Sequence, residues 1–215
     1  MAEPRSGHPW LLAVGLTVGL LLLAGCGGSA DSATGEGEGG YTAAAVLDQP
    51  YTVPDTALTD TGGQRYSLAA DTDKPLTLVF FGYTRCPDIC HVVMGSLASA
   101  MTRLDEADRQ QVDVVFVTTD PARDDEATLR DYLDRFDPSF IGLTGDLDTI
   151  VDVGADLAVA VDQGDKLPSG GYEVTHGTSV AAIDADDEVP MIWTQDTSAE
   201  QFAADVHHYL STTGS

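Results

Sequence analysis

The feature that most constrains the fold is an uninterrupted run of strand-forming residues from Leu76 to Tyr83, Leu-Thr-Leu-Val-Phe-Phe-Gly-Tyr. The run is apolar at successive positions rather than at alternate ones, so both faces of the strand must be covered. Residues 112–117 form a second run of this kind. Strands buried on both faces are typical of sheets that carry helices on both sides. The two runs therefore predict an α/β domain.

Segments with helical periodicity alternate with further strand-like segments along the rest of the chain. The apolar spacing predicts helices over residues 86–104, 126–136, about 146–153 and 199–210, the last capped by Ser198. Short strands are predicted over 157–161, 180–183 and 189–193, and the turn-forming residues 60–63 predict a hairpin between 51–53 and 65–68. This order predicts a mixed central sheet flanked by helices, with an N-terminal hairpin extension.

The composition restricts the functions that are open to the chain. Of the 215 residues, 35 are Asp or Glu and 10 are Lys or Arg, which gives a formal net charge of −25. A chain of this charge repels phosphate groups, so it argues against nucleic-acid binding and against electrostatic docking on an anionic membrane. The hydrophobic content of 43% is too high for a wholly disordered chain.

The N-terminal residues have the pattern of a targeting segment. Trp10–Ala24 is an almost purely apolar run that is short for a membrane-spanning helix and has the length of the apolar region of a signal peptide. It ends in Leu23-Ala24-Gly25-Cys26, which resembles the lipobox of bacterial lipoproteins and implies cleavage before Cys26 and lipidation of that residue. An uncleaved anchor is the alternative. Either interpretation places the rest of the chain outside the cytoplasm, where disulfides persist.

These features predict three parts of the chain. Residues 1–25 are expected to be a lipoprotein signal peptide, residues 26–49 a flexible tether rich in Gly, Ser and acidic residues, and residues 50–212 a folded domain. The domain is then expected on the extracytoplasmic side of the cell membrane, anchored through lipid on Cys26.

Cys86 and Cys90 form a C-x3-C pattern between the first buried strand and the helix predicted after it. Residues four apart share one face of a helix, and the N-terminal end of a helix lowers the pKa of a thiol. An inert disulfide would stabilise the fold little because it closes a short loop, and core cysteines would not normally follow a surface loop. We therefore interpret the pair as a redox or metal site, related to the C-x2-C pattern of thioredoxin with one residue inserted.

His176 is the candidate third ligand of such a site. Two thiolates and an imidazole form a soft donor set that suits Cu(I) best and Zn(II) next. Asp120, at the end of the second buried strand, is a candidate for electrostatic tuning of the thiols, although Asp-Pro also commonly begins a turn. We interpret His91 as a surface residue rather than a transfer ligand, and Met94 as a core residue.

Five segments occur together in a characteristic order: Phe80-Phe81-Gly82-Tyr83, Thr84-x-Cys86-Pro87-Asp88-x-Cys90, Asp120-Pro121-x-Arg123-Asp124, Phe140 to Gly145, and His176. Together they resemble the Sco/SenC family over about residues 50–210. The resemblance implies a thioredoxin-like fold and copper ligation by Cys86, Cys90 and His176. It also implies assistance in assembling the dinuclear copper centre of cytochrome c oxidase. The partners would be the copper-binding subunit of the oxidase and an unidentified thiol reductant or copper donor.

The chain departs from the usual pattern of that family at three positions. Arg85 stands where His is common, His91 where Pro often follows the second Cys, and Thr175 where Asp commonly precedes the ligand His. The last change removes an acid that could orient the imidazole, so we expect it to weaken metal binding without abolishing it.

Two classes of function fit the same residues. In a copper chaperone, reduced Cys86 and Cys90 hold Cu(I) together with His176, and oxidation of the pair to a disulfide releases the metal. In a thiol–disulfide oxidoreductase, Cys86 attacks and Cys90 resolves, and His176 is not needed. A copper or redox sensor would use the same site. We expect the chaperone, with the oxidoreductase as the alternative.

Overall fold

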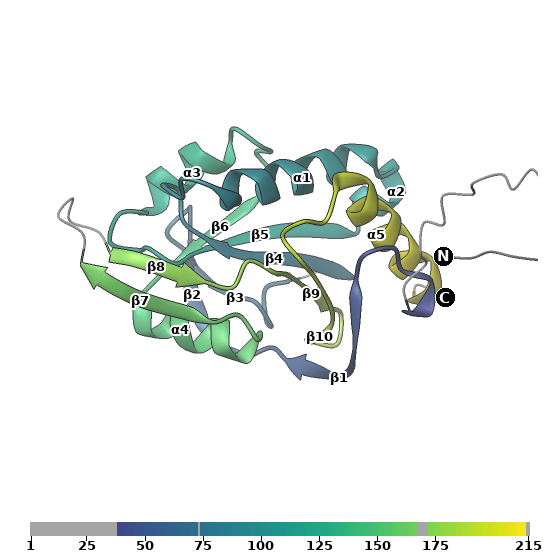
Figure 1. The fold of residues 1–215 in the computed structure, drawn as a ribbon, viewed down its shortest axis with the longest axis horizontal. Helices are drawn as coiled ribbons and strands as arrows, with labels where there is room; N and C mark the ends of the chain where they lie inside the picture. The colour runs from purple at the N-terminus through teal and green to yellow at the C-terminus, as the bar shows by residue number, and fades with distance from the viewer. Residues whose placement is uncertain (1–37, 73, 167–171, 214–215) are drawn as a thin grey trace, which may run out of the picture. The chain divides into compact units, whose positions relative to one another are not determined.

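The computed structural model describes residues 38–72, 74–166 and 172–213, which all belong to one compact unit (Figure 1). The apolar run before Cys26 and Cys26 itself lie outside the described residues. Among the helices of the described part, none combines the length and the apolar content needed to cross a membrane.

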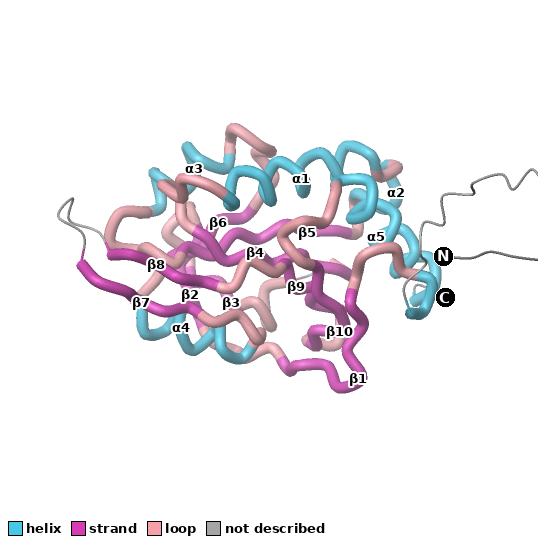
Figure 2. The backbone as a smooth tube through the Cα atoms, in the orientation of Figure 1, coloured by secondary structure: helices cyan, strands magenta, loops and turns pink. Residues whose placement is uncertain are grey.

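A mixed sheet of eight strands forms the centre of the fold. Its strand order is β1, β10, β9, β4, β5, β6, β2, β3, in which β4, β5 and β6 are parallel and the other neighbouring pairs antiparallel. A separate antiparallel pair, β7 and β8, makes a second sheet (Figure 2). The strands are β1 (Ala45–Thr52), β2 (Ala57–Asp60), β3 (Arg65–Ser67), β4 (Leu76–Gly82), β5 (Val112–Thr118), β6 (Ile141–Thr144), β7 (Val161–Lys166), β8 (Tyr172–His176), β9 (Val180–Asp184) and β10 (Glu188–Trp193). The predicted mixed central sheet is confirmed.

Helices cover both faces of the large sheet. On one face lie α1 (Ile89–Arg103), α3 (Glu126–Leu133) and α5 (Ala199–Thr213), and on the other lies α4 (Leu147–Asp156), while the short α2 (Glu106–Arg109) follows α1 (Figure 1). Along β4, Leu78 and Phe80 belong to the core beneath α1, and Val79 and Phe81 to the core beneath α4. All residues of β4 are buried. Alternate side chains thus fill two cores, which explains the continuous apolar run in the sequence.

The folded unit begins before residue 50, the boundary that the sequence predicted. A short 3-10 helix (Glu38–Gly40) precedes β1, which pairs with β10, and Ala44 is buried in the core. The residues of β1 are mostly exposed, so the strand carries little apolar signal and is held by main-chain hydrogen bonds at the sheet edge. The N-terminal hairpin exists as β2 and β3, so its first strand is 57–60 rather than 51–53.

The strand predicted over 157–161 is wrong. Helix α4 extends to the preceding residue, and Leu157 and Val159 are buried at its end. Ala158 has a left-handed φ of 56°, and the N–H of Val159 donates to the carbonyl of Gly154 at 2.7 Å. Apolar residues at alternate positions suggested a strand here. Leu157 and Val159 instead pack at the C-terminal end of α4, before β7 begins.

The C-terminal predictions are confirmed. β9 and β10 form the expected hairpin, and α5 follows it. The Ser198 hydroxyl accepts a hydrogen bond from the N–H of Gln201 at 3.3 Å, and the Gln201 side chain accepts one from the N–H of Ser198 at 3.1 Å. This reciprocal pair is a capping box, and it fixes where α5 begins.

Candidate metal site

Cys86 and Cys90 lie just beyond the carboxyl end of β4. Both are free thiols, and only 6% of Cys86 and 0% of Cys90 is exposed. The N–H of Cys86 donates to the carbonyl of Tyr83 at 3.1 Å, which closes a turn. Because α1 begins at Ile89, only Cys90 is helical, and the prediction that both thiols share one helix face is wrong. The reason lies at Asp88, whose φ of −134° and ψ of −92° are not helical and whose side chain makes no capping hydrogen bond.

The two thiols are nevertheless neighbours, because the Cys90 thiol donates a hydrogen bond to the Cys86 sulfur. Gly82, the last residue of β4, provides the space for this arrangement. A Cβ at this position would lie 3.0 Å from the Cys90 Sγ and 2.9 Å from the Phe116 Cε2. Any side chain larger than that of glycine would therefore displace the Cys90 sulfur or the ring of Phe116.

The hydrogen bonding makes the two thiols unequal. Burial raises the pKa of the Cys86 thiol, but hydrogen bonds from the Cys90 thiol and from the N–H groups of Asp88, Cys90 and Ile89 outweigh it, and the net pKa lies below its ordinary value. Burial, followed by the hydrogen bond to Cys86, raises the pKa of the Cys90 thiol far above its ordinary value. Cys86 is therefore the residue that more readily forms a thiolate.

Two tyrosines lie near the thiols. Burial, followed by the charges of Cys86 and Cys90, raises the pKa of Tyr83. Burial, followed by the charge of Cys90, raises the pKa of Tyr132, whose buried hydroxyl has no hydrogen-bond partner among the described residues. His91 is exposed, and its ring packs edge-on against Tyr132 with the centroids 5.5 Å apart. The sequence analysis interpreted His91 as a surface residue and Met94, which is fully buried, as a core residue, and the structure agrees.

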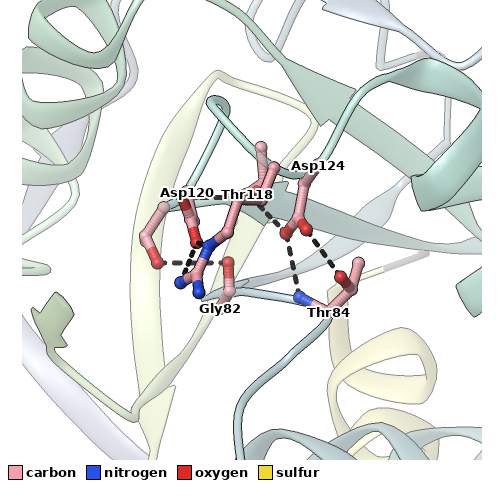
Figure 3. A network of polar contacts seen from close by, with 7 residues as sticks. Gly82, Thr84, Thr118, Asp120 and Asp124 are labelled. Carbon is pink, nitrogen blue, oxygen red and sulfur yellow. Dashed lines mark hydrogen bonds and ion pairs between the residues drawn. The ribbon is translucent and has the colours of Figure 1, made fainter. Parts of the chain in front are cut away.

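Asp124 is a site residue that the sequence analysis missed. Its carboxylate is fully buried and accepts hydrogen bonds from the N–H and the hydroxyl of Thr84, at 2.8 and 2.5 Å, and from the hydroxyl of Thr118 at 2.8 Å (Figure 3). Thr84 precedes Cys86 by two positions. The motif Asp120-Pro121-x-Arg123-Asp124 was the available signal. A sequence motif does not show, however, that its last carboxylate reaches the cysteine loop, residues 83–88 between β4 and α1.

Asp120 lies at the same edge of the sheet as the cysteines, because it follows β5 directly and β5 is parallel to β4. Its carboxylate is buried and forms an ion pair with Arg123 (Figure 3). Its N–H donates to the Thr118 hydroxyl at 3.0 Å. The charge of Asp120 is thus balanced by a neighbour, and tuning of the thiols by this residue stays a prediction.

His176 is the last residue of β8, where its backbone pairs with Val161 of β7. Its side chain lies outside the described part of the structure. Val180, four residues later, pairs with Phe80 in the antiparallel register of β9 and β4. The segment between His176 and Val180 therefore enters the sheet at the edge where β4 ends and the cysteine loop begins. Among the described residues, no group of three or more His, Cys, Asp or Glu side chains is arranged to hold a metal ion.

The chain and its fold have known relatives. The family model described as SCO1/SenC matches residues 44–211. The chain belongs to the SCO1/SenC family. Sco proteins are described as cytochrome c oxidase assembly proteins. The expected thioredoxin-like fold is confirmed by the solved structures of this family.

Three relatives show the extent of the similarity. Apo Sco1 from Thermus thermophilus has a TM-score of 0.69 at 29% identity and covers 77% of this chain and 95% of its own. Bradyrhizobium japonicum ScoI, solved with copper bound, has a TM-score of 0.63 at 30% identity and covers 75% of this chain and 98% of its own. The mitochondrial SCO2 homolog of Mus musculus is 30% identical over 158 residues, which are 73% of this chain. The match spans 62% of the mouse protein, less than two thirds of its length.

Proposed function

We propose that this Sco protein is an extracytoplasmic copper chaperone. It carries Cu(I) on Cys86, Cys90 and His176 and assists assembly of the dinuclear copper centre of cytochrome c oxidase, whose copper-binding subunit is the acceptor. The observation that carries the proposal is the pair of adjacent reduced thiols, buried and hydrogen-bonded to each other at the carboxyl end of β4. Two sulfur donors at one position suit a soft ion, and a related ScoI was solved with copper bound.

The geometry of the pair supports loading and release of such a cargo. Cys86 supplies the first thiolate because its pKa is lowered, whereas Cys90 must lose its proton as the metal binds, so loading is expected to release protons. Oxidation of the pair to a disulfide removes both sulfur donors at once. Metal loading is therefore coupled to the redox state of the pair.

A ligand role for His176 is supported by topology and by chemistry. Its strand leads into β9 at the edge where the cysteine loop begins, and an imidazole completes a soft three-ligand set. A three-coordinate Cu(I) leaves room for an incoming thiolate of the acceptor. The ligands of the acceptor can then replace those of the chaperone one at a time.

The alternative function is a thiol–disulfide oxidoreductase, and the unequal thiols favour it specifically. The Cys86 thiolate would attack one sulfur of a disulfide in the acceptor, forming a mixed disulfide and releasing the other sulfur as a thiolate. Cys90 would then lose its proton and attack the Cys86 sulfur. The products are a reduced acceptor and a Cys86–Cys90 disulfide, which an external thiol reductant must reduce before the next cycle.

The proposal extends to the N-terminal residues. The apolar run and the lipobox-like sequence support a signal peptide over residues 1–25 and lipid on Cys26, which would anchor the protein at the extracytoplasmic face of the cell membrane. Of the tether predicted over residues 26–49, residues 38–49 belong to the described folded unit. Incorporation of a radiolabelled fatty acid tests this part, and Cys26→Ser should abolish it.

An anaerobic Cu(I) titration against a colorimetric chelator tests the copper function, with the full reduced chain in detergent. We expect one Cu(I) per chain, no competitive binding in the Cys86→Ser/Cys90→Ser double variant, and affinity reduced roughly tenfold or more in His176→Ala. His91→Ala is the matched control, because this exposed histidine adjoins Cys90 and should not contribute. Binding that is indifferent to His176, or no binding at all, would favour the oxidoreductase.

A further inference from the structure

A buried acid, Asp124, supports the turn that leads to Cys86. Both oxygens of the Asp124 carboxylate accept hydrogen bonds, Oδ2 from the Thr84 N–H and the Thr118 hydroxyl and Oδ1 from the Thr84 hydroxyl (Figure 3). Asp124 and Thr118 are 0% exposed. Three donors converge on one side chain, and two of them come from the residue that lies two positions before Cys86.

Asp124 itself is fixed by the scaffold. Its N–H donates to the carbonyl of Asp120 at 3.0 Å, and its own carbonyl accepts a hydrogen bond from the Thr144 hydroxyl at 3.1 Å. Thr118 ends β5, and Thr144 ends β6. Asp124 therefore connects the ends of two core strands to the loop that follows a third, β4.

Several residues of the cysteine loop are exposed, so its conformation draws on the contacts of its buried members. Arg85, Pro87 and Asp88 are exposed, and α1 begins without a side-chain cap at Asp88. The N–H of Cys86 donates within the loop, to Tyr83. The loop conformation sets the position of the Cys86 sulfur relative to the Cys90 sulfur, which α1 and Gly82 hold.

We propose that Asp124 is a positioning residue of this site, which holds the Thr84 turn so that the Cys86 sulfur stays beside that of Cys90. The inference rests on the proposed function for its meaning, since adjacent sulfurs are what both copper binding and disulfide formation require. It assigns to the last acid of the Asp120-Pro121-x-Arg123-Asp124 motif a role that acts through Thr84 rather than on the metal. Groups of this kind orient the ligands of a site and change its affinity when they are lost.

The hydrogen-bonding groups of Asp124 and Thr84 predict which substitutions should disturb the position of the Cys86 sulfur. Asp124→Asn keeps the shape but removes the negative charge, so neutral hydrogen bonds replace the stronger charge-assisted ones, and its NH2 group would make the Thr84 hydroxyl an acceptor instead of a donor. Thr84→Val keeps the shape and the main-chain N–H but removes the hydroxyl. Thr84→Ser keeps both donors and should behave as the wild type.

The test measures copper affinity and thiol reactivity in the full chain. With Asp124→Asn we expect Cu(I) affinity to fall roughly tenfold or more, as for other residues that orient metal ligands, and Thr84→Val should cause a smaller loss. At one fixed pH, the ratio of the alkylation rates of Cys86 and Cys90 should change in both variants. Thr84→Ser should leave both the Cu(I) affinity and the ratio of the alkylation rates at the wild-type values.

Asp205→Asn is the matched control, because Asp205 is also a fully buried carboxylate with several donors, none of them from the cysteine loop. It should lower stability and leave copper affinity and the alkylation ratio at the wild-type values. The proposal is overturned if Asp124→Asn and Thr84→Val change only stability, as Asp205→Asn does. The alkylation ratio decides this even if the wild type binds no copper, which would instead contradict the proposed function.

Discussion

Asp124 and Asp205 are two fully buried carboxylates that use the same chemistry in different parts of the molecule. Asp124 accepts three hydrogen bonds from Thr84 and Thr118. Asp205, on α5, accepts hydrogen bonds from residues 42–44 and from the indole N–H of Trp193 at 2.9 Å. Each carboxylate accepts hydrogen bonds from the main chain of an irregular segment and from one side chain at the end of a core strand.

The difference between the two lies in what each segment carries. The segment held by Asp205 leads into β1 and is joined to α5 by these hydrogen bonds. The segment held by Asp124 carries Cys86. The same kind of polar cluster can thus stabilise the fold in one place and shape a reactive site in another, and burial or hydrogen-bond counts alone would not tell them apart. The predictions below use this contrast, in order of decreasing effect.

Asp205→Ala should have the largest effect on stability. It leaves the N–H groups of residues 42–44 and the Trp193 indole without their acceptor, so we expect the free energy of unfolding to fall by about 3 kcal/mol or more. Denaturant unfolding followed by tryptophan fluorescence measures this loss. The thiols should react at wild-type rates, and a loss below about 1 kcal/mol would show that water replaces the carboxylate.

Gly82→Ala tests the close packing around the Cys90 thiol. The new Cβ would lie 3.0 Å from the Cys90 Sγ, so we expect a loss of about 1–3 kcal/mol together with altered reactivity of Cys90. Gly95→Ala in α1 is the matched control, since nothing lies within 4 Å of its Cβ and it should stabilise the helix by up to about 1 kcal/mol. Equal effects of the two substitutions would contradict the close packing at Gly82.

The pH dependence of alkylation should separate the two thiols. The pKa of Cys86 is lowered and that of Cys90 is raised, and only the thiolate reacts. The rate of Cys86 should therefore rise at a lower pH than that of Cys90, and near neutral pH Cys86 should react about tenfold faster or more. Mass spectrometry of peptides after timed quenching measures both rates. Equal rates across the pH range would contradict the assignment of Cys86 as the nucleophile.

His207 lies on the same helix as Asp205 but is exposed. Its substitution should change the free energy of unfolding least. Its Nδ1 lies 2.6 Å from the Asp108 carboxylate, and this hydrogen bond raises the pKa of His207. The stabilisation is therefore complete below the unfolded-state pKa and disappears as the pH rises through the folded-state pKa. Because solvent screens this exposed pair, His207→Gln should cost at most about 1 kcal/mol at pH 5 and nothing at pH 9, measured by denaturant unfolding. Asp108→Asn should abolish the same pH dependence.

Much of this protein follows from local patterns in its sequence. The apolar run of β4 requires two covered faces, and the C-x3-C spacing after it places two thiols at the end of a buried strand. These predictions hold because burial and periodicity depend on residues close together in the chain. The mixed sheet, the C-terminal hairpin and the helix cap at Ser198 were predictable for the same reason.

The tertiary structure decided what depends on distant residues. The Thr84–Asp124 hydrogen bond joins positions 40 apart, and the Thr42–Asp205 bond joins positions 163 apart. No local pattern encodes such a pairing, because only the folded sheet brings the strand ends together. The start of α1 after Cys86 and the exposed strand β1 belong to the same class, since surrounding packing and edge pairing outweigh local propensity there. The sequence determined that two thiols follow the end of β4, and the tertiary structure decided which buried acid reaches Thr84, two residues before the first of them.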